Sequence, residues 1–503
     1  MSGSHSIAPS KVYVFMNRVT IPAYSFLLLS FFCSASADER PNIVFLLSDD
    51  QATYSMGCYG TPGVKTPNMD QLAREGMIFD NHYDTTAICM ASRANIMTGM
   101  FEYKAGTNFD HGPMMQSTWE KTYPMMLRAA GYTTAVAGKF GFEVKRGSEK
   151  PRLPIDDFDR WGGGRGQTSY VTKQNKSMAK YAKEFPHSTR SYGAFSRDFI
   201  HDAAKEDKPF CLSISFKAPH HPVQPDPIDK DVYKGVKFTK PDNYGRQAGE
   251  HFSLQSRQGR QYERFNSWHY ADDYNGVMAK YYQQIYAIDV AVGMVRKALA
   301  DAGVEKNTVV FYTSDNGFMN GSHGYGSKVI PYQESVRVPM IMFDPREENS
   351  GKELRCDELT GNVDFMPTIL KLAGLSVPEN VDGKDLMSLY RDPTTSIHES
   401  LPLINVWGPK KVHSFGVVTK QWKYIYWPYD EGEFEKTEEL FDVASDPGEM
   451  KNLAKTTTAT TELTEMRARY DSAVNHWKEN TVSYNKYKSF GKIFERKETA
   501  KAN

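Results

Sequence analysis

Two pairs of oxygen-bearing side chains come directly after apolar runs that are typical of buried strands. Asp49-Asp50 follows the run NIVFLLS (Asn42–Ser48), and Asp315-Asn316 follows the run TVVFYTS. In open α/β sheets ligands bind outside the carboxyl ends of the strands, so we expect both pairs at that edge. Three carboxylates and one amide oxygen are hard donors that suit Ca²⁺ better than zinc or copper. Either pair alone would be an ordinary turn, but two pairs in the same setting indicate a metal site.

A cysteine and an arginine stand four positions apart in a segment that we expect to form a helix. The residues CMASRANIMTG begin at Cys89 and end at Gly99, a typical helix stop. A side chain at a helix start lies in positive potential that favours anions, and Arg93 adds a planar fork suited to an oxyanion. The local pattern alone leaves two alternatives open, a buried structural cysteine and a thiolate nucleophile.

The order of several short motifs along the chain resembles that of the formylglycine-dependent sulfatases, which belong to the alkaline phosphatase superfamily. In that family a cysteine is followed two positions on by Pro or Ala and four positions on by Arg, as Cys89, Ala91 and Arg93 are here. Each motif is weak by itself, but their shared order is specific and covers about residues 41–454. The other matching motifs are Asp49-Asp50, Gly131-Tyr132-Thr133-Thr134, Gly138-Lys139, Pro219-His220, Asp315-Asn316-Gly317, Gly321-Ser322-His323-Gly324, Lys328, Glu334-Ser335-Val336-Arg337-Val338-Pro339, Val363-Asp364, Pro367-Thr368, Leu440-Phe441-Asp442 and Asp446-Pro447-Gly448-Glu449.

The resemblance implies a sulfuric ester hydrolase with one Ca²⁺ per chain and a formylglycine made after translation from the cysteine. As a hydrate, this aldehyde would offer two hydroxyls on one carbon, one to attack sulfur and one whose deprotonation expels sulfate. The resemblance further implies that the metal ligands are Asp49, Asp50, Asp315, Asn316 and the modified Cys89.

The same resemblance implies a cationic surround for the sulfate group. Arg93, Lys139 and Lys328 would share its negative charge. His220 would lie beside the sulfate, and His323 would lie near the ester oxygen or the sugar. Either histidine would then give a proton to the departing alcohol.

The chain departs from the family pattern at two places. Ala91 stands where Pro is commoner, so the partner that modifies Cys89 is either a formylglycine-generating enzyme or an anaerobic sulfatase-maturating enzyme. The family usually has a His shortly after the Gly-Lys motif, hydrogen-bonded to the formylglycine. Here the residues after Lys139 are Phe140-Gly141-Phe142-Glu143, so another residue must make that contact or it is missing.

Strand and helix signals alternate from residue 42 to about residue 390. This pattern predicts an α/β fold with a large, mostly parallel sheet flanked by helices, and the resemblance makes it alkaline phosphatase-like. Short aromatic strands such as Trp422–Trp427 then predict a smaller C-terminal α+β domain with an antiparallel sheet. The expected divisions are a signal peptide at 1–37, a catalytic domain at 38–392, and a C-terminal subdomain and tail at 393–503.

The first residues are typical of an export signal. Lys11 and Arg18 precede an apolar run at 21–32, and Ala35-Ser36-Ala37 offers a cleavage site. We therefore expect a periplasmic or secreted protein without a stable membrane insertion. Lys+Arg and Asp+Glu both total 61, so no global positive field exists to hold nucleic acid. Of five cysteines, four remain after cleavage, and at most one disulfide can form if Cys89 is modified.

Two segments suggest a sugar-binding surface. Residues 244–274 are rich in Arg and aromatic residues, and residues 161–170 are rich in Gly. Aromatic faces and Arg forks suit sulfated or uronate-bearing sugars, although a lid without a ligand is an equal reading. We expect a sulfated carbohydrate or polysaccharide fragment as substrate. Alternatives are a phosphodiesterase or phosphonate monoester hydrolase of the same superfamily, an unconverted protein that only binds sulfated glycans, and a cysteine hydrolase.

Overall fold

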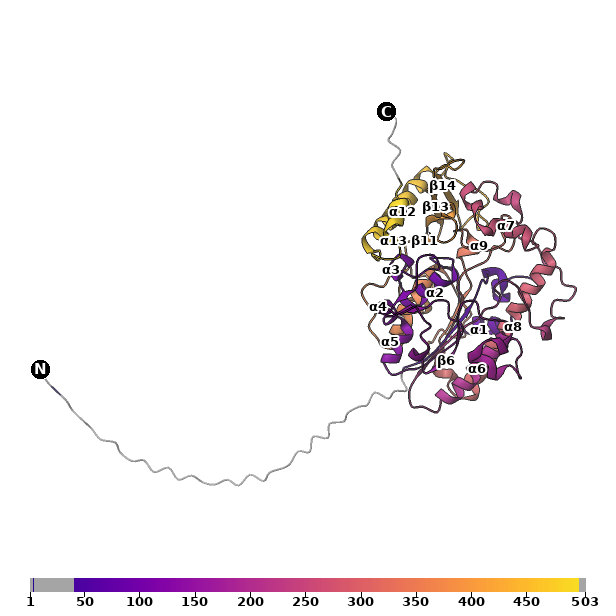
Figure 1. Ribbon diagram of the computed structural model, residues 1–503, viewed down its shortest axis with the longest axis vertical. Helices are drawn as coiled ribbons and strands as arrows, with labels where there is room; N and C mark the ends of the chain where they lie inside the picture. The colour runs from indigo at the N-terminus through magenta and orange to yellow at the C-terminus, as the bar shows by residue number, and fades with distance from the viewer. Residues whose placement is uncertain (1–2, 4–39, 497–503) are drawn as a thin grey trace, which may run out of the picture. The chain divides into compact units, whose positions relative to one another are not determined.

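An eight-stranded sheet forms the centre of the described chain, which comprises residue 3 and residues 40–496 of this computed structural model (Figure 1). Its strands lie in the order β10-β2-β9-β8-β1-β7-β4-β6. All neighbouring pairs are parallel except the two that involve β9, which runs opposite to β2 and β8. The expected mostly parallel sheet is confirmed. The strands are β1 (Asn42–Ser48), β2 (Met77–Tyr83), β4 (Thr133–Lys139), β6 (Arg160–Gly164), β7 (Phe210–Ser215), β8 (Thr308–Ser314), β9 (Met340–Phe343) and β10 (Leu354–Gly361).

Strand β1 is buried on both faces because alternate side chains of a strand point to opposite sides of the sheet. Ile43, Phe45 and Leu47 enter one apolar core, whereas Val44 and Leu46 enter the other. A strand between two cores needs a continuous apolar sequence, which explains why this segment shows no polar alternation.

Helices cover both faces of the sheet, as Figure 1 shows. Helices α2, α5, α10 and α11 contribute to the first core, and α1, α6 and α8 contribute to the second. The long helix α8 packs along α6, and its buried residues keep the three- and four-residue spacing of one helix face. The helices are α1 (Pro67–Glu75), α2 (Cys89–Thr98), α5 (Tyr123–Ala129), α6 (Ser188–Ala203), α8 (Tyr274–Asp301), α10 (Phe365–Leu372) and α11 (Met387–Arg391).

The C-terminal region carries a second sheet of four antiparallel strands in sequence order, as expected. Helix α12 packs on β12 and β13, with Tyr470 and Trp477 in the apolar cluster between them. The elements are β11 (Leu401–Asn405), β12 (Ser414–Val418), β13 (Trp422–Trp427), β14 (Thr437–Asp442), α12 (Thr460–Asn480) and α13 (Tyr487–Ile493). The remaining short elements are α3 (Glu102–Ala105), α4 (Gln116–Trp119), α7 (Arg260–Ser267), α9 (Gln333–Val336), β3 (Met114–Met115) and β5 (Val144–Lys145).

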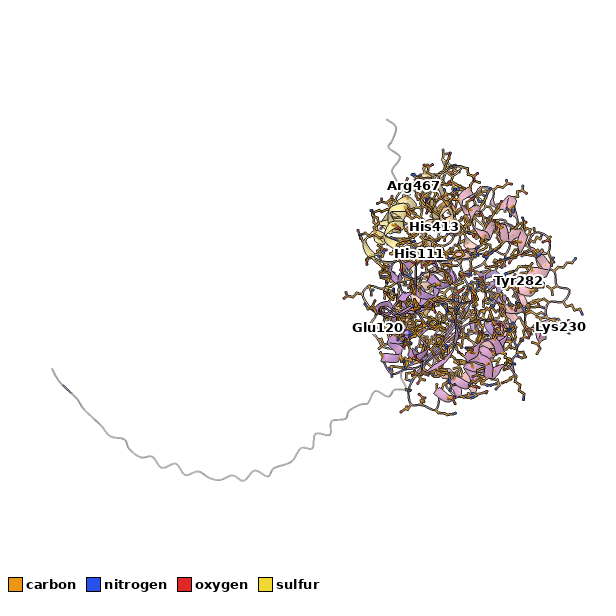
Figure 2. The ribbon with its side chains drawn as sticks, in the orientation of Figure 1. His111, Glu120, Lys230, Tyr282, His413 and Arg467 are labelled. Carbon is orange, nitrogen blue, oxygen red and sulfur yellow. The ribbon has the colours of Figure 1, made fainter. Side chains whose placement is uncertain are left out.

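The expected boundary between a catalytic domain and a C-terminal subdomain at 392/393 stays a prediction. Side chains from the two sides of this boundary pack against one another. His111 and His413, labelled in Figure 2, come from the two sides of that boundary. The rings of both residues meet Phe490 edge-on. Cys58, Cys89, Cys211 and Cys356 are free thiols. No helix within residues 40–496 has the length and apolar character needed to cross a bilayer. The export signal expected before residue 38 lies outside the described residues.

Candidate active site

Four adjacent parallel strands deliver most of the expected site residues to one edge of the sheet. In the order β8-β1-β7-β4, the carboxyl ends of these strands lie next to one another. Side chains that are far apart in sequence therefore meet, as expected for an open α/β sheet. The residues at these ends are Asp315-Asn316 after β8, Asp49-Asp50 after β1, His220 after β7 and Lys139 as the last residue of β4.

The two acidic pairs form one buried centre. Asp49, Asp50, Asp315 and Asn316 are each 0–2% exposed. The Asp50 backbone N–H donates to Asp315 Oδ1 over 3.3 Å, and Asn316 Nδ2 donates to Asp50 Oδ1 over 2.7 Å. Asp50 has a φ of 68°, a left-handed conformation in which Asp and Asn are more frequent than most residues. This turn brings the carboxylates of both strand ends together.

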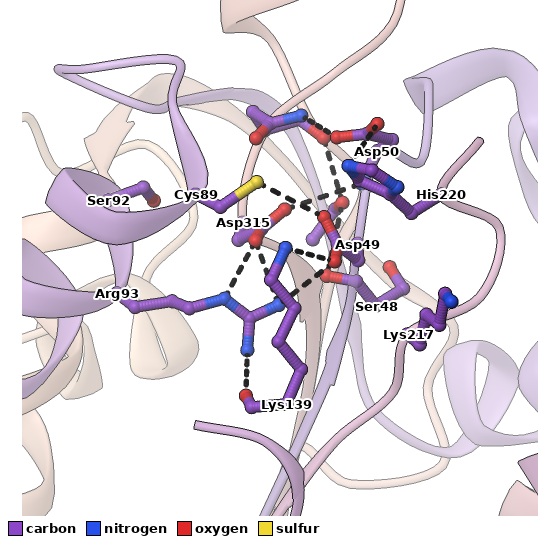
Figure 3. A network of polar contacts seen from close by, with 12 residues as sticks. Ser48, Asp49, Asp50, Cys89, Ser92, Arg93, Lys139, Lys217, His220 and Asp315 are labelled. Atoms are coloured by element: carbon purple, nitrogen blue, oxygen red, sulfur yellow. Dashed lines mark hydrogen bonds and ion pairs between the residues drawn. The ribbon is translucent and has the colours of Figure 1, made fainter. Parts of the chain in front are cut away.

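Helix α2 directs Cys89 and Arg93 towards the acidic centre (Figure 3). The two residues are four positions apart and therefore share one helix face. Cys89 Sγ donates to Asp49 Oδ1 over 3.3 Å. Arg93 Nε donates to Asp315 Oδ2 over 2.8 Å, and its Nη1 donates to the carbonyl of Lys139 over 2.6 Å. The guanidinium thus joins the ends of β8 and β4.

Two lysines complete the centre. Lys139 forms an ion pair with Asp49, and Lys328 forms one with Asp50. Lys328 Nζ also donates to Cys89 Sγ over 3.0 Å. Val329, the next residue, has a φ of 94°, which is a strained conformation for a β-branched side chain. Such strain concentrates at functional sites and here accompanies the placement of Lys328.

Neighbouring cations keep the two acids of β1 ionised despite their burial. Burial alone would raise the pKa of Asp49, but Lys139 and His220 outweigh it and hold that pKa below its usual value. The same holds for Asp50. Burial would raise its pKa, but Lys328 and His220 outweigh burial and lower that pKa. Charged carboxylates are the form in which such groups bind a metal ion.

Cys89 has the opposite electrostatic situation. Burial and the carboxylates of Asp315 and Asp49 raise the pKa of its thiol to about 12. An unmodified Cys89 therefore keeps its proton at neutral pH and is a poor nucleophile. This environment disfavours the cysteine hydrolase that the sequence left open.

The oxygen donors of this centre fit a hard metal ion. Single ligand atoms of Asp49 and Asp50 lie within 4.8 Å of one another and of Cys89 and His220, and the sulfur of Cys89 occupies the place that a formylglycine oxygen would take. Asn316 Oδ1 is buried and has no hydrogen-bond partner among the described residues, which suits an amide oxygen that binds a cation. Three cationic side chains balance three carboxylates here, so a divalent ion would leave the site positive and attractive to an anion.

The family histidine that the chain lacks after Lys139 has no room in this structure. Gly141 has a φ of 102°, and a Cβ built on it would lie 2.4 Å from Arg93 Cδ. Phe140 packs into the first apolar core. The polar side-chain contacts of Cys89 come instead from Asp49 and Lys328.

His220 lies beside the acidic centre. Its Nε2 is 3.7 Å from Asp50 Oδ2, and its Nδ1 is buried without a partner in the described chain. The loop that carries it is attached to β1, because the Asp49 N–H donates to the Ala218 carbonyl over 3.1 Å. Burial lowers the pKa of His220, although Asp50 and Asp49 act against that shift.

The structure does not bring His323 to this group. Asn243 Nδ2 donates to His323 Nε2 over 3.0 Å, and His323 Nδ1 donates to the Ala248 carbonyl over 3.1 Å. Both ring nitrogens are therefore engaged, and the residue joins Glu334 and Glu449 in a second buried cluster. The cause is its backbone: His323 has a φ of 52°, and its N–H donates to the Asn243 carbonyl over 2.6 Å.

A cavity of about 530 Å³ opens above Cys89. Lys328, Asp50 and His220 line it together with residues that the sequence did not single out as site residues. The segments 244–274 and 161–170 were the signals for Arg260, Arg264, Trp268 and Gln167, but nothing local indicated the others. These additional lining residues are Ile88, Phe109, Gln167, His221, Pro222, Arg260, Arg264, Trp268, Ser327 and Trp407.

Comparison with known proteins agrees with this geometry. The Sulfatase family model matches residues 41–375, and a model described as "N-sulphoglucosamine sulphohydrolase, C-terminal" matches residues 321–476. The chain is 28% identical over 479 residues to an N-acetylglucosamine-6-O-sulfatase of Bacteroides thetaiotaomicron, covering 82% of this chain and 83% of that protein.

Two solved structures extend the comparison. One is a protein solved in complex with its substrate, D-glucosamine-2-N,6-O-disulfate. That protein superposes on this chain with a TM-score of 0.72 and 25% identity, covering 89% of this chain and 99% of that one. The phosphonate monoester hydrolase of Agrobacterium radiobacter has a TM-score of 0.70 at 19% identity, covering 87% and 96%, and shares the fold. The chain belongs to the sulfatase family, within the alkaline phosphatase superfamily, and is a sulfuric ester hydrolase.

Proposed function

We propose that this protein is an exported, Ca²⁺-dependent sulfatase that removes O-sulfate from a carbohydrate with a formylglycine made from Cys89. The observation that carries the proposal is the position of Cys89. Its Sγ lies 3.3 Å from Asp49 Oδ1 and 3.0 Å from Lys328 Nζ, at the floor of an open cavity. A nucleophile at this position would meet a sulfate group and a metal ion together.

The chain's own residues would hold the nucleophile and the sulfate. Asp49, Asp50, Asp315 and Asn316 would bind Ca²⁺ together with residue 89. When bound, Ca²⁺ would lower the pKa of the attacking hydroxyl and offset the charge of the ester. A formylglycine hydrate would supply that hydroxyl and a second one for the release of sulfate.

The cationic side chains would stabilise the charge that builds on the sulfate oxygens. Lys139 and Lys328 already form ion pairs with carboxylates next to Cys89, and Arg93 is fixed by Asp315 and the Lys139 carbonyl. Groups held in place before the reaction lose no energy to reorganisation when charge develops. They serve as an oxyanion site for sulfate.

His220 would give a proton to the departing alcohol. Its Nδ1 has no partner within residues 40–496, and the residue lines the cavity. The negative charge of a bound sulfate ester would favour the protonated imidazole. His323 has no free ring nitrogen, so we leave this role to His220 alone.

The substrate class and the cellular setting follow from the same proposal. Aromatic and Arg side chains around the cavity suit a sugar, and the N-acetylglucosamine-6-O-sulfatase and the glucosamine disulfate complex support a sulfated saccharide. The export signal expected at 1–37 would deliver the chain to the periplasm or the medium. A formylglycine-generating or anaerobic sulfatase-maturating enzyme would act on Cys89.

The test is a comparison of esters on the Ca²⁺-loaded enzyme, purified from a host that contains a maturation enzyme. Released sulfate is measured for 4-nitrophenyl sulfate and for N-acetylglucosamine 6-sulfate. The matched phosphate monoester, phosphate diester and phosphonate ester are assayed in parallel as alternative substrates. We expect the highest kcat/KM on a sulfate ester. A higher kcat/KM on the diester or the phosphonate would overturn the proposal in favour of that alternative.

A further inference from the structure

Two arginines stand at the rim of the active-site cavity, away from the catalytic cations at its floor. Arg260 and Arg264 are four residues apart on α7 and therefore lie one turn apart on the same face. Both line the cavity that also contains Asp50, Cys89 and Lys328. A ligand bound at residue 89 would occupy the same cavity as these two guanidinium groups.

Neither arginine has an anionic partner in the described chain. Arg264 Nη1 donates to the hydroxyl of Ser327 over 2.8 Å, and no ion pair holds Arg260 or Arg264 within residues 40–496. Arg190, which is more deeply buried, instead has Asp226 and Asp229 on its two Nη atoms. Two neighbouring guanidiniums without an ion-paired carboxylate leave positive charge that only the more distant Asp50 and Glu263 offset.

The electrostatics of Arg264 agree with this picture. Burial lowers its pKa, and the like charge of Arg260 lowers it further, although the carboxylates of Asp50 and Glu263 act against both effects. An anion placed between the two groups would relieve both effects, because it restores an opposite charge and accepts the free N–H groups.

Aromatic side chains hold both forks in place. The Arg264 guanidinium lies over the ring of Trp268, 4.2 Å from its centroid, and that of Arg260 lies over Trp407 at 5.1 Å. Trp268 in turn stacks on His221 with centroids 3.7 Å apart. Stacking restricts the planar guanidinium, so less entropy is lost when it binds an anion.

Consecutive residues connect the two arginines with the contacts of Cys89. Ser327, which bonds Arg264, is followed by Lys328, which contacts Cys89. A saccharide that places one sulfate at residue 89 would therefore find a second cationic group along the same cavity wall. The aromatic rings beside the arginines would meet the apolar faces of its sugar ring.

We propose that Arg260 and Arg264 form a second anion subsite, for a sulfate or carboxylate that the substrate carries in addition to the sulfate that is cleaved. This inference rests on the proposed function, because it assumes a sulfate at residue 89. It selects polyanionic saccharides over monosulfated ones. Arg260 and Arg264 are specificity residues in this account and take no part in the chemical step.

The test measures binding, so it does not depend on conversion of Cys89. The Ca²⁺-loaded Cys89→Ser chain is titrated by calorimetry with N-acetylglucosamine 6-sulfate, with D-glucosamine-2-N,6-O-disulfate, and with the 6-sulfated sugar linked to a uronic acid. The three ligands carry no second anion, a second sulfate, and a carboxylate. Arg264→Gln and Arg260→Gln are added to this background. Arg257→Gln is the matched control, since within residues 40–496 the contacts of Arg257 are two backbone carbonyls and the ring of Tyr262, and it does not line the cavity.

We expect at least one doubly charged ligand to bind about 10-fold or more tightly than the monosulfate. Arg264→Gln should weaken that ligand about 10- to 100-fold and change the monosulfate by about 2-fold or less. Arg257→Gln should change neither. The ligand that loses affinity identifies the second anion as sulfate or carboxylate.

Two results would overturn the inference. One is equal affinity of the parent chain for all three ligands. The other is a loss of affinity for the monosulfate in Arg264→Gln that is as large as the loss for the doubly charged ligand. That result would place Arg264 in the sulfate site itself. The proposed function fails separately, if the converted enzyme releases no sulfate from any ester while the discrimination between ligands remains.

Discussion

The buried centre around Cys89 and the rim of the cavity at Arg260 and Arg264 both carry cationic side chains. The two groups differ in whether these cations have carboxylate partners. Beneath the floor, which Cys89 and Lys328 line, Arg93 and Lys139 are 1% exposed, and each is paired with a carboxylate. At the rim, Arg260 is exposed and Arg264 is half-buried, and neither has a carboxylate partner within residues 40–496. The floor is complete before a ligand arrives, whereas the rim needs a ligand to balance its charge. In the proposed mechanism, this difference separates the groups that perform the reaction from those that select the substrate.

The origin of the two regions in the fold explains the difference. The floor consists of the ends of four adjacent strands and one face of α2, which are held by the sheet and by both apolar cores. The rim consists of α7 and loop residues such as Trp407 from the C-terminal region. Loops tolerate substitution without loss of the fold, so the rim is where substrate preference can change.

Replacement of the nucleophile should have the largest effect and tests the floor directly. We expect Cys89→Ser to lower sulfate release by about 1,000-fold or more in a host that converts only cysteine, because a serine ester of sulfate lacks the second hydroxyl. Substrate affinity by calorimetry should be retained. Cys58→Ser, at a half-buried thiol outside the cavity, is the control and should keep full activity. Multiple-turnover activity of Cys89→Ser without formylglycine contradicts the account.

Removal of calcium should have the next largest effect. After dialysis against a chelator we expect sulfate release to fall by about 100-fold or more, because the charge of the ester is then offset less. Added Ca²⁺ should restore activity and raise the Tm until the site is saturated, and Mg²⁺ should restore less. Full activity of protein that contains no metal by elemental analysis would rule out this role.

Replacement of Arg93 by lysine keeps the positive charge but removes the planar guanidinium. It therefore tests how far activity depends on the fixed geometry of this group. In Arg93→Lys we expect kcat/KM to fall by about 100-fold, because one ammonium cannot hold both Asp315 and the Lys139 carbonyl. Arg190→Lys is the matched control, at a buried arginine that pairs with Asp226 and Asp229 away from the cavity. It should lower the Tm but leave kcat/KM within about 2-fold. Equal activity losses in both variants would mean that the effect of Arg93 is one of stability alone.

An aromatic substitution at the rim should have the smallest effect. We expect Trp407→Ala to raise KM for a sulfated saccharide by about 3- to 10-fold, because Arg260 loses the ring beneath it. The kcat for 4-nitrophenyl sulfate should not change. Ile228→Ala, at a side chain that is 76% exposed, serves as the control. A loss of kcat in Trp407→Ala would show that the rim takes part in the chemical step.

The acidic pairs and the helix of the site could be predicted from the sequence because they have local signals, whereas Lys139, Lys328 and His220 were expected only from the resemblance. Asp49-Asp50 and Asp315-Asn316 end apolar runs, and Cys89 and Gly99 bracket a helix. The resemblance of the motif order then joined these segments, which no local pattern could do. The reversed direction of β9 was not readable, since a short apolar strand has the same sequence pattern in either direction.

The rest of the site depends on contacts between distant segments. The sequence marked residues 244–274 but could not distinguish a lid from a binding surface, because the contacts of Arg264 with Ser327 and of Arg260 with Trp407 are not local. His323 was expected near the substrate because of its motif. Its left-handed backbone and its bond to Asn243 turn it into a second cluster, and neither feature has a sequence signature.

The mass of the peptide that contains residue 89 tests the central claim most directly. Trypsin cleaves after Arg74 and Arg93 and so releases residues 75–93 with Cys89 as their only cysteine. In enzyme that turns over sulfate esters, we expect this peptide to be about 18 Da lighter than the cysteine form, and the lighter fraction to rise in proportion to kcat. Fully active enzyme that yields only the unmodified cysteine peptide would contradict the account.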